Sequence, residues 1–148
     1  MLVLTSFKKA KNYNGQKFSI ARFQPSGFAF SELPFLAATD KDGNKLLLRD
    51  FRNPIEGYEK ALFEGYAARW DKIKAWLDSL QEDKTVVLCC WCPYSESTKN
   101  QIREFGNFCC HSGLIGQLVN KYRPDISVVL DSDRKYKLVE RWKPNYLE

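Results

Sequence analysis

The chain has 148 residues, a net charge of +5 and a 44% share of hydrophobic residues. The apolar share excludes an intrinsically disordered chain, and the modest charge excludes a dedicated, strongly basic nucleic-acid binder. No apolar run approaches the roughly 18 residues that span a membrane, so we expect one cytoplasmic domain, residues 1–148, with no membrane partner.

The first half of the chain predicts two strands and a helical stretch. Residues 2–5 are apolar, and residues 17–23 alternate in a pattern typical of a strand, with a polar loop or helical turn between them. Asn53 and Pro54 mark a helix start, and apolar residues then recur at helical spacing as far as residue 80. Gly65 within this stretch leaves open one long helix or two shorter ones.

The second half alternates strands and helices. Residues 85–90 and 126–130 are apolar runs typical of buried strands, and residues 95–104 and 111–122 favour helices. This alternation predicts an α/β fold whose sheet is mostly parallel. The first run shows no polar alternation, which favours helices on both faces of the sheet and hence a three-layer domain.

All five cysteines and the single histidine fall between residues 89 and 111. Each cluster lies where a predicted strand or loop meets a predicted helix, which is where α/β proteins commonly bind ligands. The odd number of cysteines argues against a secreted disulfide scaffold. The cluster comprises Cys89, Cys90, Cys92, Cys109, Cys110 and His111.

Cys110 is the candidate thiolate of this cluster, because it directly precedes a predicted helix. Free N–H groups and the positive end of the helix dipole stabilise a thiolate, and His111 could act as its acid–base partner. The same first turn, with Ser112 and Gly113, could bind an anion. Cys90, with Cys92, would supply a supporting or resolving thiol. The alternative is that the cysteines simply pack as small hydrophobic residues.

Metal and nucleotide sites have less support. Cys89 and Cys92 form a C-x-x-C pair, but a second pair with zinc-ligand spacing is missing, so we expect no metal. A cysteine-dependent phosphatase would need an arginine about six residues after Cys110, where the chain has Gly116. Neither a G-x-G-x-x-G motif nor a P-loop occurs, so we expect no nucleotide cofactor.

Three segments together resemble the family catalogued as domain of unknown function 488. They are residues 19–25, a strand ending in arginine and an aromatic-proline loop; residues 86–90, a strand ending in cysteine; and the Cys110–His111 pair opening a helix. Their order covers about residues 2 to 130. The resemblance implies a small Rossmann-like or flavodoxin-like domain, but it does not imply a specific function.

The chain departs from that family pattern at two positions. Ser112 stands where the family usually has arginine, and Cys92 stands where it usually has an acidic residue. Residues 94–108 also form a longer connection than usual. If the family arginine binds an anion, Arg22 or a residue of this connection, such as Arg103, must take its place here.

Two functional hypotheses follow. In the first, a thiol-dependent or anion-binding domain uses Cys110, His111 and Arg22 on a small anionic ligand. Arg22 ends a predicted strand, so it needs either a bound anion or a structural ion pair. In the second, a non-enzymatic module binds nucleic acid or a protein through the basic and aromatic residues 134–143, which could equally dock on the core. The oligomeric state stays open.

Overall fold

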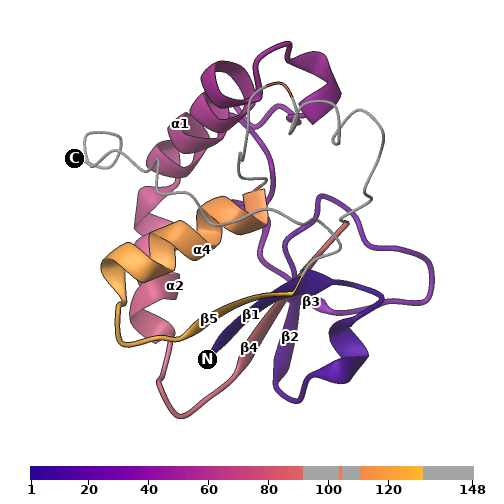
Figure 1. Ribbon diagram of the computed structural model, residues 1–148, viewed down its shortest axis with the longest axis vertical. Helices are drawn as coiled ribbons and strands as arrows, with labels where there is room; N and C mark the ends of the chain where they lie inside the picture. Colours follow the sequence, from indigo (N-terminus) through magenta and orange to yellow (C-terminus); the bar gives the residue numbers. More distant parts are fainter. Residues whose placement is uncertain (92–103, 105–110, 132–148) are drawn as a thin grey trace.

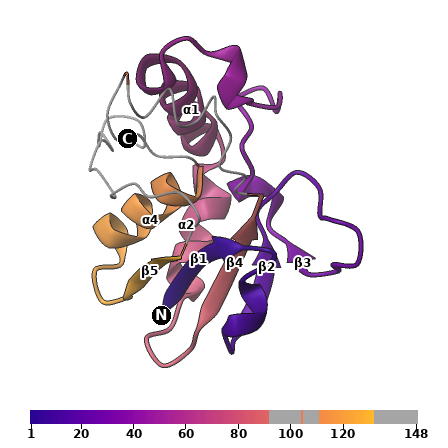
Figure 2. The same ribbon diagram turned by 45° about the vertical axis from the view of Figure 1, so that its right-hand side comes forward.

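The computed structural model describes residues 1–91, 104 and 111–131, which contain a five-stranded sheet in the order β3-β2-β4-β1-β5. All neighbouring strands are parallel, and Figures 1 and 2 show them side by side in this order. The predicted, mostly parallel α/β fold is therefore confirmed. The strands are β1 (Leu2–Ser6), β2 (Gln16–Ser19), β3 (Ser31–Glu32), β4 (Val86–Cys90) and β5 (Val128–Asp131).

The helical stretch after residue 53 begins as predicted and divides in two. The Asn53 side chain accepts hydrogen bonds from the backbone N–H groups of Ile55 and Glu56, as an N-cap does. The division falls at Arg69, four residues after Gly65. The helices are the π-helix η4 (Pro54–Glu59), α1 (Lys60–Ala68), α2 (Trp70–Ser79) and α4 (His111–Tyr122), and the 3-10 turns are η1 (Ala10–Asn12), η2 (Pro34–Leu36) and η3 (Leu48–Asp50).

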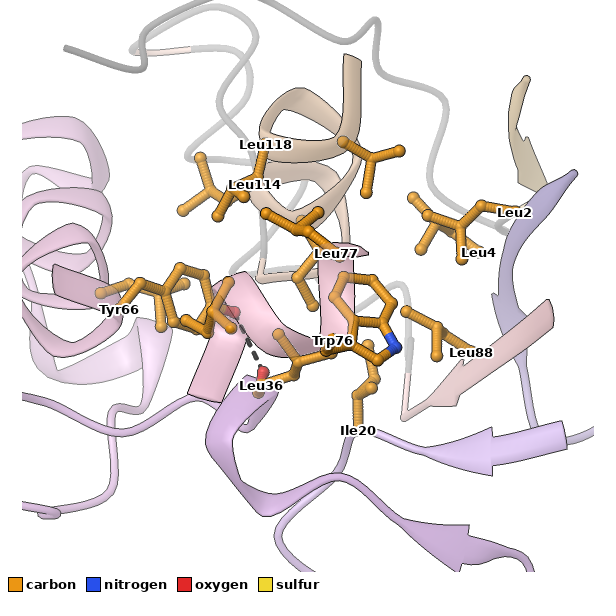
Figure 3. Packing of buried hydrophobic residues seen from close by; sticks show 14 of the residues in the cluster. Leu2, Leu4, Ile20, Leu36, Tyr66, Trp76, Leu77, Leu88, Leu114 and Leu118 are labelled. Atoms are coloured by element: carbon orange, nitrogen blue, oxygen red, sulfur yellow. Dashed lines mark hydrogen bonds between the residues drawn. The ribbon is translucent and has the colours of Figure 1, made fainter. Parts of the chain in front are cut away.

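The main hydrophobic core lies between the sheet and helices α1, α2 and α4 (Figure 3). Burying one leucine-sized side chain in this core stabilises the folded state by roughly 1.5–3 kcal/mol. The Tyr66 hydroxyl, inside the core, donates to the carbonyl of Leu36 at 3.0 Å. Fully buried members include Leu2 and Leu4 of β1, Leu88 of β4, Leu62 of α1, Ile73 of α2, and Leu114 and Leu118 of α4.

The opposite face of the sheet packs against the β1–β2 crossover. Val3, Val87 and Cys89 of the sheet contact Phe7 and Ala10 of the crossover in a second buried cluster. Residues 7–15 are fewer than a parallel crossover helix usually needs, so the 3-10 turn η1 takes the place of an α-helix. Among the described residues, the three α-helices therefore share one face, and η1 covers the other.

The chain leaves β1 and β4 on opposite faces, although these strands are neighbours in the sheet. After β1 it crosses to β2 on the face of η1, whereas after β4 it reaches β5 through α4, on the other face. The two crossovers run in opposite directions on opposite faces, so they have the same hand. Such a reversal opens a crevice at the carboxyl ends of the two strands.

Several element boundaries differ from the predicted ones. Strand β2 ends at Ser19, four residues before the end of its predicted strand, and β5 begins two residues later than predicted. Helix α4 has the predicted bounds. The predicted helix over residues 95–104 lies outside the described residues except for Glu104. Within the described part of the chain, none of the helices combines the length and apolarity needed to cross a bilayer.

Candidate functional site

A cavity of about 480 Å³ opens at the carboxyl edge of the sheet, where β1 and β4 separate. Ser6 and Cys90 are the last register partners of these two strands, and both line it. Its volume falls within the range of roughly 300–1,000 Å³ that is usual for small-molecule sites. The lining residues are Ser6, Phe7, Lys8, Lys11, Pro25, Phe28, Cys90 and Trp91.

The strand ends form the polar floor of this cavity. Cys90 is almost fully buried, and its Sγ lies 3.8 Å from the carbonyl oxygen of Thr5, to which the thiol donates. Ser6 is also buried, and its Oγ accepts from the backbone N–H of Lys9 at 3.3 Å. Because a parallel ladder fixes both strand ends, these side chains hold defined positions before any ligand binds.

Aromatic rings form much of the remaining wall. The buried ring of Phe7 has its centroid 5.4 Å from that of Phe28 and 6.0 Å from that of Trp91. The Trp91 indole N–H donates to the carbonyl of Phe23 at 2.8 Å, and the two rings are also in contact. Trp91 is therefore held in one orientation, although it is 45% exposed.

Among the residues that the structure describes, the charged members of the cavity lining are Lys8 and Lys11, both exposed residues of the segment that follows β1. No acidic side chain occurs in this described part of the lining. Lys9, between them in the chain, instead forms an ion pair with Asp131, with 3.3 Å between Lys9 Nζ and Asp131 Oδ1. A ligand in the cavity would thus meet two ammonium groups and, within the described part of the wall, no competing carboxylate, an arrangement that favours an anion.

Asp131 belongs to a separate polar cluster next to η1. Its carboxylate accepts hydrogen bonds from the Tyr13 hydroxyl and from Lys9, which tie the β1–β2 crossover to the end of β5. The hydrogen bond from Tyr13 holds the pKa of Asp131 below its usual value and raises the pKa of Tyr13. The cluster does not line the cavity, so its role is to position the crossover.

The two cysteines of β4 have different surroundings. Cys90 lines the cavity, whereas Cys89 is buried in the cluster on the opposite face. Burial raises the pKa of Cys89 to about 11, because a thiolate there would lose its hydration. Cys89 is therefore a neutral packing residue, whereas Cys90, itself almost fully buried, belongs to the wall of the cavity.

The other predicted thiol and anion residues lie apart from the cavity or outside the described residues. Cys92 and Cys110 are among the residues that the structure does not describe. His111 begins α4, as predicted, but it does not line the cavity. Ser112 and Gly113 are buried in the first turn of α4 and do not line it either.

Arg22 does not end a strand. It follows β2 by three residues in an exposed loop, where its guanidinium carbon lies 5.9 Å from the ring centroid of Phe23. The expectation of a half-buried arginine is wrong, because β2 ends at Ser19. Its guanidinium forms no ion pair within the described residues. The structural ion pair is thus not formed there, and the proposed anion contact stays a prediction.

Sequence reasoning missed Lys8, Lys11 and Phe28 as site residues. Residues 8–15 resembled an ordinary polar loop, and the residues after 28 gave no clear pattern. The available signal was two lysines in the segment that directly follows a buried strand, which is where an α/β ligand site begins. Within residues 1–91, 104 and 111–131, no group of three or more metal-ligating side chains occurs.

The fold and cavity define a parallel α/β protein with a small-molecule-sized site at its strand reversal. Comparisons with protein-family models, with curated proteins and with solved structures found no match. The resemblance to domain of unknown function 488 therefore stays a prediction. The basic and aromatic segment 134–143, on which the nucleic-acid hypothesis depends, lies outside the described residues.

Proposed function

We propose that this protein binds a small anionic ligand in the cavity between the carboxyl ends of β1 and β4. The observation that carries this proposal is the presence of two lysines, Lys8 and Lys11, in a cavity wall whose described residues include no acidic side chain. In parallel α/β sheets, the point where neighbouring strands send the chain to opposite faces is the usual ligand site. The positive net charge of +5 acts in the same direction, since it favours the approach of an anion.

Each part of the lining has a separate role in this proposal. Lys8 and Lys11 attract the anionic group and donate hydrogen bonds to it. Ser6, at the end of β1, supplies a hydroxyl that can donate to a ligand oxygen while its Oγ accepts from Lys9. Cys90 contributes a thiol beside the bound molecule. The strands supply a fixed frame, so little ordering is required on binding.

Titration with inorganic pyrophosphate tests the anion site. The Lys8→Gln/Lys11→Gln double variant should bind pyrophosphate at least about tenfold more weakly than the parent protein, because it loses two charge-assisted contacts. Lys41→Gln/Lys72→Gln is the matched control, since both lysines are exposed and neither lines the cavity. Isothermal titration calorimetry at fixed salt measures both. Equal weakening in the two double variants, or no binding by the parent, would contradict the proposal.

A second candidate function is thiol chemistry at the start of α4. The supporting observation is that α4 begins at His111, the residue directly after Cys110. A helix start favours a thiolate on the residue that precedes it. We therefore expect Cys110 to react with iodoacetamide at about pH 6 faster than the other four cysteines. Equal, slow labelling of all five would exclude this chemistry.

A further inference from the structure

We infer that the ligand of the proposed anion site carries a planar aromatic ring, which packs on the exposed rings of Phe28 and Trp91 in the cavity wall. This inference rests on the proposed anion site and adds the chemical class of its ligand: an aromatic phosphate, of which nucleotides and simple aryl phosphates are the two sources. The evidence is the arrangement, exposure and support of the three rings, together with the charge beside them.

The rings of Phe28 and Trp91 both contact the ring of Phe7. The rings of Phe28 and Trp91 are inclined to that of Phe7 by 58° and 64°, at centroid distances of 5.4 and 6.0 Å. Phe28 and Trp91 both line the cavity but make no ring contact with each other within the described residues. They are therefore two separate aromatic surfaces of the cavity wall. Aromatic rings attract another ring at centroid distances of about 4.5–7 Å, so either surface can pack against a planar ligand.

Phe28 and Trp91 remain exposed in the cavity wall while the Phe7 ring behind them is buried. Phe28 and Trp91 are 36% and 45% exposed, whereas Phe7 is only 4% exposed. A ligand ring packed on Phe28 or Trp91 would remove apolar surface from water, which favours binding. Trp91 is already fixed by its hydrogen bond to the Phe23 carbonyl at 2.8 Å. A fixed wall loses less conformational entropy when the ligand binds.

The lysines specify the second half of the ligand. Lys8 and Lys11 line the same cavity as the aromatic walls, so one molecule can meet both. A neutral aromatic compound would leave the two ammonium groups without an anionic partner, and a bare anion would leave the rings uncovered. A volume of about 480 Å³ suits a single small molecule and not a folded partner. An aromatic ring joined to a phosphate satisfies both parts of the wall.

Three probes separate the ring from the charge: AMP, 1-naphthyl phosphate and ribose 5-phosphate. AMP contains the phosphate and sugar of ribose 5-phosphate and adds only the base. We expect AMP, 1-naphthyl phosphate or both to bind at least about tenfold more tightly than ribose 5-phosphate, as expected for stacking on an aromatic side chain. Whichever of the two binds more tightly identifies the nucleotide or the aryl source.

Variants of the walls supply the matched comparison. Trp91→Leu and Phe28→Leu should each reduce the advantage of the tighter aromatic probe over ribose 5-phosphate by about fivefold or more. Trp70→Leu is the control, because Trp70 packs on Tyr122 and does not line the cavity. Circular dichroism confirms that each variant is folded, and Phe28→Tyr, which keeps an aromatic ring, should retain the preference.

The outcomes distinguish the two proposals. If all three probes bind equally and binding requires Lys8 and Lys11, the anion site stands and the aromatic inference is overturned. If the aromatic probes bind tightly but the Lys8→Gln/Lys11→Gln variant binds them equally well, the anion site is overturned and the ring preference stands. Tight binding of a thymidine dodecanucleotide without binding of AMP or 1-naphthyl phosphate would overturn the inference in favour of a nucleic-acid surface.

Discussion

Cys89 and Cys90 are adjacent in the chain, yet their side chains lie on opposite faces of β4. Cys90 packs with the helical core and reaches the cavity, whereas Cys89 packs with Phe7 and Ala10 beneath the β1–β2 crossover. Successive residues of a strand alternate between faces, so the alternation is a direct consequence of strand geometry. The two thiols therefore have different surroundings.

Alkylation should separate these two cysteines. At neutral pH we expect iodoacetamide to label Cys90 at least about tenfold faster than Cys89, because Cys90 belongs to the wall of the described cavity and a pKa of about 11 leaves Cys89 almost entirely protonated. Labelling of Cys89 should increase with pH as its thiolate fraction rises towards that pKa. Fragment mass spectrometry of the 85–99 peptide locates the label.

Ligand protection provides the control for this labelling. A saturating concentration of the tightest-binding probe should slow the labelling of Cys90 and leave that of Cys89 unchanged. In the Cys90→Ala variant, the remaining labelling of this strand should be slow. Equal rates for Cys89 and Cys90 in the native protein would contradict the different environments of the two thiols.

The Asp131 cluster should make stability depend on pH in the acid range. Its hydrogen bonds from Tyr13 and Lys9 hold the folded-state pKa of Asp131 below the usual 3.8. As pH falls, Asp131 is therefore protonated at a higher pH in the unfolded chain than in the folded protein. The stabilisation that Asp131 contributes is complete above the unfolded pKa and is lost as pH falls through the folded pKa. Asp131→Asn should lower the free energy of unfolding at neutral pH by about 1 kcal/mol, a small value because the carboxylate is partly exposed.

Urea unfolding at neutral pH and at about pH 3 measures this contribution. The difference between Asp131→Asn and the parent protein should shrink at the lower pH, where the parent carboxylate begins to protonate. Asp83→Asn, at an exposed position of the turn before β4, is the control for the loss of one negative charge. A difference between Asp131→Asn and the parent that is unchanged across this range would show that the carboxylate charge does not support the crossover.

Arg69, at the break between α1 and α2, holds the preceding loop through backbone carbonyls. Its Nε donates to Phe35 at 2.9 Å, its Nη1 to Asp40 at 3.1 Å, and its Nη2 to Ala37 and Thr39, both at 3.4 Å. A planar guanidinium can reach several acceptors at once, whereas a single ammonium group cannot. The side chain therefore fixes the path of this loop.

Substitution of Arg69 should destabilise the fold. We expect Arg69→Met to lower the free energy of unfolding by about 2–3 kcal/mol, since partly buried carbonyls lose charge-assisted hydrogen bonds. Arg69→Lys should recover less than half of that loss, although the charge is kept. Arg49→Met, at an exposed position of η3, should have little effect and is the control. Chemical denaturation compares the three variants, and full recovery by lysine would contradict the role of the guanidinium geometry.

Gly65 should be intolerant of a side chain even though it lies inside α1. A Cβ added there would lie 2.3 Å from the carbonyl oxygen of Thr39, which is closer than atoms can approach. Gly65→Ala should therefore cost about 1–3 kcal/mol, although alanine favours an open helix by about 1 kcal/mol. Thermal unfolding measures the change. Ala75→Gly, at an exposed position of α2, measures how much the difference in helix propensity between alanine and glycine is worth in this protein. A Gly65→Ala protein that is more stable than the parent would exclude the close loop contact.

The regular elements were predictable where one local signal dominated. The apolar run ending at Cys90 predicted β4, and the periodicity after His111 predicted α4 with its observed bounds. The end of β2 was less predictable, because the alternation of apolar and polar residues continues to Phe23 while pairing with β4 ends at Ser19. Pairing depends on where the neighbouring strand lies, and one sequence segment does not contain that information.

The sequence by itself determined the fold class and the identity of the strand that carries the candidate site, because apolar periodicity and helix-start residues act locally. Only the tertiary structure decided which residues surround that strand end. It brought Lys8, Lys11 and Phe28 to Cys90, about 60 to 80 residues away along the chain, through the parallel pairing of β1 with β4. It also separated Cys89 from Cys90, since the crossover covers one face of β4 and the helices cover the other.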